Sequence, residues 1–270
     1  MTRLFISDID GTLVRKDKTL TEPTVAAIKR LRAAGVPVTL ISARPPSGMF
    51  AHAERLEIDL PLGAFNGGTI FRPDGTILSA AFLPAAIATD ALDRLRAAKI
   101  DRWVFADGKW YASHPDSRHV PREEVASGVE PIFTDDFNAM IDRIDKIVGV
   151  SDDAPLVAQV EADLVAAHGT QATIACSQPY YLDITALAAN KGDGVAALAA
   201  AIGIDLADVT VAGDMPNDLP MFARAGHSIA MGQAPQSVRD AADTVTGPTD
   251  EDGLADAVGQ LADMAERSFL

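Results

Sequence analysis

The 270-residue sequence is poor in cysteine, in positive charge and in long hydrophobic runs, and each shortage excludes a class of protein. Its one cysteine, Cys176, cannot form an internal disulfide framework, and the apolar residues around it predict a buried thiol in a strand. No apolar run approaches the length that spans a bilayer, and the N-terminus lacks the apolar segment of a signal peptide. We therefore predict a cytoplasmic protein with no membrane partner.

Basic residues are outnumbered by acidic ones, with 23 lysines and arginines against 38 aspartates and glutamates, and the net charge is -15. Such a charge repels the phosphate backbone of nucleic acids, so we expect no nucleic-acid partner. The chain is long enough to bury a sizeable core, either as one large domain or as two.

Short apolar runs alternate with helical segments in the first 83 residues. Buried strands are predicted over residues 3–6, 36–41 and 62–65, with helices from residue 21 or 22 to 35 and over about 46–56. Strands over 69–71 and 76–78 flank Pro73-Asp74-Gly75, which predicts a hairpin. Strands that alternate with helices form a mostly parallel sheet, and ligands bind at the carboxyl ends of its strands.

The pattern changes over residues 84–186, where hairpins and helices predict a separate α+β domain. Helices are expected over 84–98 and 155–168, and strands over 102–105, 109–112, 146–150, 173–175 and 180–184. The alternation resumes near residue 190, with a helix over 192–202, strands over 209–212, 227–231 and 244–246, and a last helix over about 251–265. The predicted fold class is therefore α/β, a Rossmann-like, doubly wound and mostly parallel sheet built from residues 1–83 and 187–270.

Polar side chains follow four of the predicted strands at their carboxyl ends. They are Asp8 and Asp10, Ser42, Asn66, and the group Asp214, Asn217 and Asp218. Oxygen ligands that meet in one cleft suit a hard cation, and Mg2+ is the natural choice when phosphate is the partner. Lys191 begins a predicted helix, where both its charge and the helix dipole favour an anion.

These groups meet the requirements of phosphoryl transfer, which are neutralisation of charge and a nucleophile placed in line. A carboxylate can be that nucleophile and form an aspartyl phosphate. A second carboxylate two residues away can then donate a proton to the leaving oxygen and later accept one from water. This division of roles needs both Asp8 and Asp10.

The motifs Asp8-Ile9-Asp10-Gly11-Thr12, Ser42, Lys191 and Gly213-Asp214-Met215-Pro216-Asn217-Asp218, in this order, resemble the four motifs of the haloacid dehalogenase (HAD) superfamily of phosphohydrolases. The insertion over residues 84–186 is similar to the α+β cap domain of the Cof-type (HAD-IIB) members, which are mostly phosphatases of small phosphorylated metabolites. The resemblance implies a Mg2+-dependent phosphatase whose partner is such a metabolite, with sugar phosphates as the expected substrates.

The resemblance also implies roles for the acidic residues. Asp8 would be the nucleophile and Asp10 the general acid and base, and the backbone carbonyl of Asp10 would bind the metal. Asp214 would be a direct metal ligand. Asp218 and Asn217 would support the metal site or the lysine. The expected metal site therefore comprises Asp8, Asp10, Asp214 and Asp218.

The same resemblance implies that Ser42 and Lys191 hold the phosphoryl oxygens, while Arg44, Asn66 and Gly67 line the mouth through which substrate enters. Ser42 stands where the family more often has threonine, and the hydroxyl is retained. Purely structural roles are alternatives for two of these residues, Arg44 and Asn66. An arginine at a strand end often pairs with a carboxylate, and Asn66 can simply satisfy the turn that it begins.

Two other functions use the same residues. A phosphomutase would return the phosphoryl group instead of releasing it, and a non-catalytic phospho-acceptor or binding module would use Asp8 without turnover. A dehydrogenase is disfavoured because no Gly-x-Gly-x-x-Gly turn follows the first strand. His114 and His119 are expected at the surface, and Trp103, Trp110 and Tyr111 are expected to pack a sheet face.

Overall fold

The computed structural model describes residues 2–267, which belong to two compact units. The first unit comprises the chain up to Ala43, the segment Met49–Leu78 and the chain from Asn190 onward. The second comprises Arg44–Gly48 and Ser79–Ala189. The predicted domain limits, residues 1–83 with 187–270 and residues 84–186, stay a prediction.

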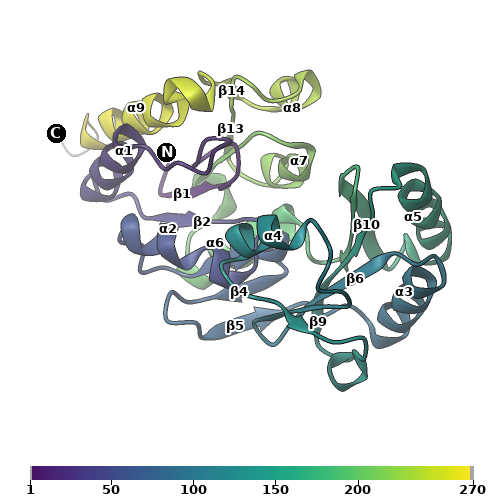
Figure 1. Cartoon of the computed structure of the whole chain (residues 1–270). Coiled ribbons are helices and arrows are strands. Elements are labelled where there is room, and N and C mark those ends of the chain that lie inside the picture. The colour runs from purple at the N-terminus through teal and green to yellow at the C-terminus, as the bar shows by residue number, and fades with distance from the viewer. Residues whose placement is uncertain (1, 268–270) are drawn as a thin grey trace. The chain divides into compact units, whose positions relative to one another are not determined.

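A five-stranded parallel sheet forms the centre of the first unit, in the order β14-β13-β12-β1-β2 (Figure 1). Its strands are β1 (Leu4–Ser7), β2 (Val38–Leu40), β12 (Val209–Gly213), β13 (His227–Ala230) and β14 (Thr244–Val245). The register places Leu4 beside Val209 and Ser7 beside Ala212, so β1 and β12 end at the same edge. This sheet confirms the predicted α/β fold.

Helices of the first unit bury apolar stripes against this sheet and against one another. They are α1 (Glu22–Ala33), α2 (Phe50–Arg55), α6 (Lys191–Ile202), α7 (Leu219–Phe222), α8 (Gln236–Ala241) and α9 (Gly253–Arg267). Leu4, Ile6 and Val211 of the sheet share a core with Val195 and Leu198 of α6. Helices α1 and α9 lie side by side (Figure 1).

The strand predicted over residues 62–65 was expected to join the parallel sheet, but it is not one of the five strands of that sheet. Instead β3 (Leu62–Ala64) pairs antiparallel with β4 (Thr69–Phe71), and β5 (Ile77–Ala80) completes a separate three-stranded sheet. The antiparallel pairing follows from the turn Phe65–Gly67, in which Phe65 and Asn66 have left-handed backbone angles that reverse the chain. Ile41 and Gly63 still form an isolated parallel bridge.

Two helices also differ from their predicted limits. The predicted helix over 46–56 is divided into a short 3-10 turn, Pro46–Gly48, and α2. The last helix begins at Gly253, after the short 3-10 turn Thr249–Glu251. Among the described residues, no helix is long and apolar enough to cross a membrane.

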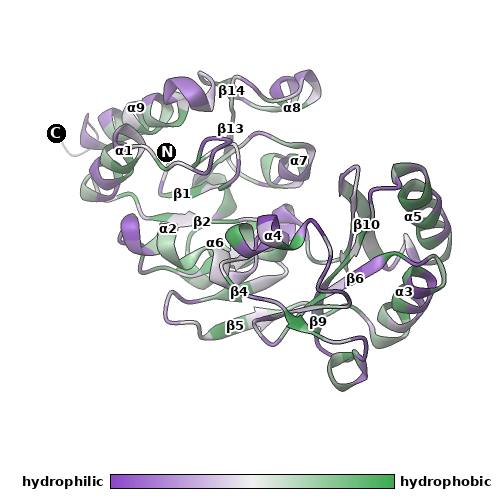
Figure 2. Ribbon diagram, viewed as in Figure 1, coloured by the Kyte–Doolittle hydropathy of each residue, from purple (hydrophilic) through white to green (hydrophobic). Residues whose placement is uncertain are grey.

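The second unit contains a six-stranded sheet in the order β10-β11-β9-β6-β7-β8, antiparallel except for the β7 and β8 pair. The strands are β6 (Asp101–Ala106), β7 (Lys109–Ala112), β8 (Ile132–Phe133), β9 (Ile144–Val150), β10 (Ala172–Gln178) and β11 (Tyr181–Ala186). Its helices are α3 (Ala85–Ala97), α4 (Val120–Ser127) and α5 (Ala154–His168). Helices α3 and α5 each carry hydrophobic and hydrophilic residues (Figure 2).

Successive side chains of a strand point to opposite faces of this sheet, so the two faces carry different sets of residues. Val104, Ile147 and Leu182 belong to one core with residues of α3 and α5. Trp103 and Trp110 are fully buried and meet edge to face, with ring centroids 5.0 Å apart. The prediction that these tryptophans pack a sheet face is therefore confirmed.

Cys176 is exposed, so the predicted buried thiol is wrong. It lies near the end of β10, which is an edge strand of the sheet. Ile174, two residues earlier, reaches the core, whereas the Cys176 sulfur donates to a carboxylate oxygen of Glu161 at 3.3 Å. An apolar stretch of sequence does not reveal where an edge strand leaves the helices that cover it.

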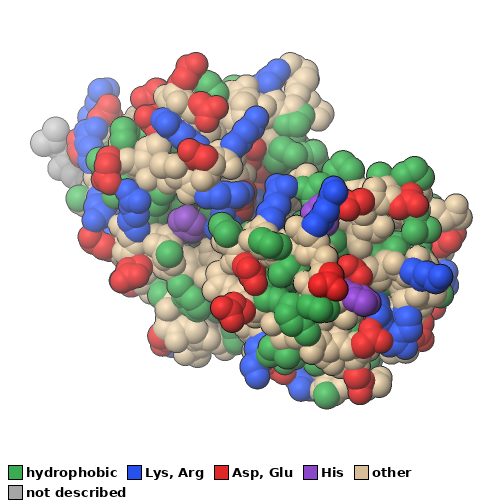
Figure 3. All heavy atoms as spheres, viewed as in Figure 1, with side chains coloured by type: hydrophobic (Ala, Val, Ile, Leu, Met, Phe, Trp, Pro, Cys, Tyr) green, Lys and Arg blue, Asp and Glu red, His purple; other side chains and the backbone are tan. Residues whose placement is uncertain are grey.

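Acidic and basic side chains are interspersed on the face of the molecule in Figure 3. His114 is exposed and His119 is partly buried, where it stacks on Tyr180 with ring centroids 4.3 Å apart. Neither histidine belongs to a group of potential metal ligands among residues 2–267.

Candidate active site

Asp8 and Asp214 emerge from neighbouring parallel strands at the same sheet edge. The backbone amide of Asp8 continues the β1–β12 ladder by donating to the carbonyl of Ala212 at 2.9 Å. Asp214 follows Gly213, the last residue of β12. Only 5% of Asp8 and 6% of Asp214 is exposed. The topology thus brings together two aspartates separated by more than 200 positions in sequence.

Lys191 joins this pair from the first position of α6. Asn190 caps the helix by accepting from the Asp193 amide at 2.9 Å, which fixes where Lys191 begins it. The Lys191 ammonium lies 2.5 Å from Asp8 Oδ1 and 2.5 Å from Asp218 Oδ1, and the residue is 1% exposed. A lysine so buried is stable only because both carboxylates compensate its charge.

Asp218 also fixes the loop that carries Asp214. Its Oδ2 accepts from the backbone amides of Asp214 and Met215, each at 2.8 Å. A side chain at Gly213 would place its Cβ 2.4 Å from Asp218 Cγ, so the turn requires glycine there. One carboxylate therefore binds the lysine with one oxygen and orders the loop with the other.

Asp8, Asp214 and Asp218 form a group whose carboxylate oxygens lie within 4.8 Å of one another, and of the residues that the structure describes they are the only such group. Three carboxylates and one ammonium leave a formal charge of -2. Clustered oxygen donors with this charge fit a hard divalent cation.

The electrostatics of the group reflect its burial. Burial raises the pKa of Asp8 to about 8, although Lys191 opposes this shift. Burial and the charge of Asp218 raise the pKa of Asp214 to about 6. For Lys191, burial lowers the pKa, but Asp218 and Asp8 more than offset it and the net shift is upward. The lysine is therefore positively charged at neutral pH.

The Asp10 carboxylate is not part of this group of three. The carboxylate forms an ion pair with Lys18, whose Nζ is 2.6 Å from Asp10 Oδ1. A bridge between Asp10 and Val14 shapes the turn that brings Lys18 back to Asp10. Lys18 was not predicted as a partner of Asp10, because nothing in the spacing of residues 10 and 18 indicates this turn.

Ser42 and the turn at residues 65–67 form a second part of the same unit. Ser42 is 1% exposed, its amide donates to Gly63 O at 2.8 Å, and its carbonyl accepts from the Asn66 amide at 2.7 Å. The Asn217 side chain donates to Asn66 Oδ1 at 3.1 Å. The structure therefore links Ser42, Asn66 and Asn217.

Arg44 belongs to the second unit and donates to the carbonyl of Gly48 at 3.1 Å. Gly67, by contrast, lies in the first unit with φ of 86° and packs against α6: a Cβ added to it would lie 2.4 Å from Gly194 Cα. The role of Gly67 in the structure is thus to let α6 approach. Substrate contacts by Arg44 and Gly67 stay predictions.

Three further polar residues lie around Gly11 and Asp214: Thr12, which belongs to the first motif but had no predicted role, and Gln233 and Thr249, which were not predicted. Thr12 donates to Asp214 Oδ1 at 3.2 Å, and Gln233 donates to the Gly11 carbonyl at 2.6 Å. The Thr249 hydroxyl donates to the same carbonyl. Gln233 follows β13 closely, so a search at the carboxyl end of the strand predicted over 227–231 could have found it.

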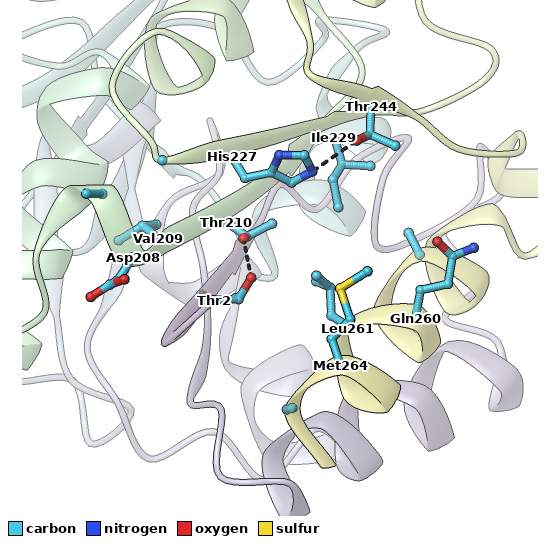
Figure 4. Close-up of a pocket in the computed structure, with 14 residues that line it drawn as sticks. Thr2, Asp208, Val209, Thr210, His227, Ile229, Thr244, Gln260, Leu261 and Met264 are labelled. Carbon is cyan, nitrogen blue, oxygen red and sulfur yellow. Dashed lines mark hydrogen bonds between the residues drawn. The ribbon is translucent and has the colours of Figure 1, made fainter. Parts of the chain in front are cut away.

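A cavity of about 420 Å³ lies at the opposite edge of the parallel sheet (Figure 4). It is lined by the amino ends of β12, β13 and β14 and by α9. Two pairs of its polar side chains bond to each other, Thr2 to Thr210 at 2.8 Å and His227 to Thr244 at 3.0 Å. None of the predicted site residues lines it. The size of a cavity therefore does not identify the site of the chemistry in this protein.

Comparison with known proteins agrees with this geometry. The profile of the haloacid dehalogenase-like hydrolase family matches residues 5–258. The chain therefore belongs to the haloacid dehalogenase-like hydrolases, and its recognition as a Cof-type phosphatase of that family is confirmed.

Three relatives show how far the likeness extends. The HMP-PP phosphatase of Cronobacter sakazakii is 30% identical over 87% of this chain and 85% of its own. The 5-amino-6-(5-phospho-D-ribitylamino)uracil phosphatase YwtE of Bacillus subtilis is 27% identical over 94% and 96%. A haloacid dehalogenase-like hydrolase from Bacteroides thetaiotaomicron, 26% identical, superposes with a TM-score of 0.88 over 97% of this chain and 100% of its own.

Proposed function

We propose that this protein is a Mg2+-dependent phosphatase that hydrolyses small phosphorylated metabolites through an aspartyl phosphate on Asp8. The observation that carries this proposal is the buried group of Asp8, Asp214, Asp218 and Lys191, in which an ammonium lies 2.5 Å from the candidate nucleophile. The two curated relatives named above are phosphatases of small phosphorylated molecules. We infer sugar phosphates as the first class of substrate to test.

Mg2+ would be held by the carboxylates of Asp8 and Asp214 and by the backbone carbonyl of Asp10, with Asp218 in support. The bound ion would supply neutralisation of the negative charge on the phosphoryl oxygens. The fit rests on the donor set, because three carboxylates outnumber the single ammonium that faces them.

The reaction divides between the two aspartates of the first motif. A carboxylate oxygen of Asp8 attacks phosphorus, and the bond from phosphorus to the ester oxygen breaks. For this step Asp10 must leave its ion pair with Lys18 and carry a proton, which it gives to that leaving oxygen, so the alcohol departs neutral. Asp10 then takes a proton from water as the water oxygen attacks phosphorus, which releases inorganic phosphate and restores Asp8.

The remaining residues bind the substrate. Lys191 would hold the phosphoryl oxygens from the position in which it now contacts Asp8, and the buried Ser42 would donate its hydroxyl to them. Asn217, joined to Asn66 by a hydrogen bond, would help to orient the phosphate or its ester group. Arg44, Asn66 and Gly67 are proposed to contact the rest of the molecule.

The test is release of phosphate from a panel of sugar phosphates, nucleotides and cofactor phosphates, with Mg2+ or with EDTA. We expect Mg2+-dependent release by the natural protein, and loss of at least about 1,000-fold in kcat for Asp8→Asn and for Asp10→Asn. Asp74→Asn, in an exposed turn, is the matched control. An isomerised ester without free phosphate would identify a mutase. Correct folding without any release would point to a phospho-acceptor module.

A further inference from the structure

Gln233 lies in the loop after β13, in a position that the backbone fixes tightly. The amide of Met231 donates to Gly213 O at 3.0 Å, and the amide of Gly232 donates to Gly247 O at 3.1 Å. Arg239 donates to the carbonyl of Gly232 at 3.2 Å. The loop therefore presents the Gln233 side chain from a rigid base.

Both ends of the Gln233 amide are used. Its nitrogen donates to the carbonyl of Gly11 at 2.6 Å, and its oxygen accepts from the Thr249 amide at 2.9 Å. The nitrogen carries a second hydrogen, and the side chain lies close to the Asp214 carboxylate. One side chain thus connects the first motif, the fourth motif and the loop before α9.

Gly11 and Asp214, the two residues that Gln233 connects, touch each other directly. Gly11 has φ of 86°, and a Cβ on it would lie 2.3 Å from Asp214 Oδ2. The other carboxylate oxygen of Asp214 accepts from the Thr12 hydroxyl at 3.2 Å. Gly11 therefore packs closely against the Asp214 carboxylate, and the bond from the Gln233 amide to the Gly11 carbonyl holds this peptide in place.

We propose that Gln233 is a positioning residue that holds the Asp214 carboxylate and the Gly11 peptide in the arrangement that binds Mg2+. This inference rests on the proposed function, because it concerns the metal of that site. Polar residues around a metal site orient its ligands, and removing such a residue typically lowers metal affinity 10- to 100-fold. Gln233 is itself exposed, so its substitution leaves the hydrophobic core intact.

The experiment compares Gln233→Met with Gln236→Met. Both changes replace an amide by an apolar chain of similar length, but Gln236 bonds to Asp240 and Arg239 of α8, each at 2.6 Å, and to neither motif. Mg2+ binding is measured by titration calorimetry on each protein without substrate. We expect the dissociation constant for Mg2+ to rise about 10- to 100-fold in Gln233→Met and to change less than twofold in Gln236→Met.

Kinetics separate positioning from general damage. In Gln233→Met, the Mg2+ concentration for half-maximal rate should rise with the dissociation constant, while kcat at saturating Mg2+ stays within about threefold of the natural enzyme. Gln233→Asn keeps the amide but shortens the chain, and it should weaken Mg2+ binding as well. It serves as the second variant if Gln233→Met does not fold.

Failure of this inference differs from failure of the proposed function. If the natural protein binds Mg2+ and releases phosphate, but Gln233→Met binds Mg2+ within twofold of it, the positioning role is wrong and the phosphatase stands. A kcat that falls sharply even at saturating Mg2+ would likewise overturn it. A natural protein that neither binds Mg2+ nor releases phosphate would remove the proposed function, and this inference with it.

Discussion

Glu123, in α4 of the second unit, shows how much one partly buried charge can affect stability. Burial raises its pKa to about 7 from 4.5. Lys146, Arg44 and Arg122 oppose the shift, and Asp183 adds to it. The folded protein therefore binds this proton more tightly than the unfolded chain does. The contribution of Glu123 to stability is present below about pH 4.5 and is lost as the pH rises through 7.

We predict that Glu123→Gln removes this pH dependence. Relative to the natural protein, the variant should gain about 2 kcal/mol of unfolding free energy between pH 5.5 and pH 8, since one pKa unit corresponds to about 1.4 kcal/mol. Urea unfolding at the two pH values measures this gain. Glu124→Gln, which removes the same charge one residue later, is the control. Equal gains in both variants would contradict the assignment to Glu123.

At the scale of elements, the contact of α6 with the turn at residues 65–67 determines where Lys191 lies. A Cβ on Gly194 would lie 2.6 Å from Gly67 Cα and 2.7 Å from Ile41 Cδ1. The backbone of the turn at residues 65–67 cannot move away easily, because its residues already have left-handed backbone angles. The absence of a side chain at Gly194 thus lets α6 carry Lys191 to Asp8.

We predict that Gly194→Ala destabilises the protein by about 1–3 kcal/mol, as overpacking of a filled contact does. Turnover should fall as well, because α6 must shift and take Lys191 with it. Gly259→Ala is the matched control, since Gly259 is also helical but has no neighbour within 4 Å of an added Cβ. It should stabilise α9 by up to about 1 kcal/mol. Thermal unfolding and phosphate release test both, and similar behaviour of the two variants would refute the packing argument.

At the scale of the whole molecule, charge is the dominant feature. The chain carries -15, and this total includes a formal charge of -2 concentrated in the buried group when its three carboxylates are ionised. A ligand that binds only the folded state stabilises it, and a divalent cation here would also relieve repulsion among the three carboxylates.

We therefore predict that Mg2+ stabilises the fold and that EDTA removes the gain. At 100 times its dissociation constant, Mg2+ should add about 2.7 kcal/mol. Scanning calorimetry measures this increment, with KCl of equal ionic strength as the control. Asp214→Asn should lose the increment. Superposable scans in Mg2+ and in EDTA would argue against a metal at this site.

The sequence by itself determined the strands and helices of the parallel sheet and the residues that gather at its carboxyl edge. Apolar periodicity and turn residues are local signals, and parallel strands necessarily end at the same edge. Asp8, Asp214 and Lys191 could therefore be found without coordinates.

Only the tertiary structure decided which side chains meet. It separated β3 from the parallel sheet, exposed Cys176, paired Lys18 with Asp10 and placed Gln233 between Gly11 and Asp214. Each of these outcomes depends on register, on the backbone angles of a turn or on contacts more than 200 positions apart. Such contacts are set by packing of the complete chain, and no local pattern of residues encodes them.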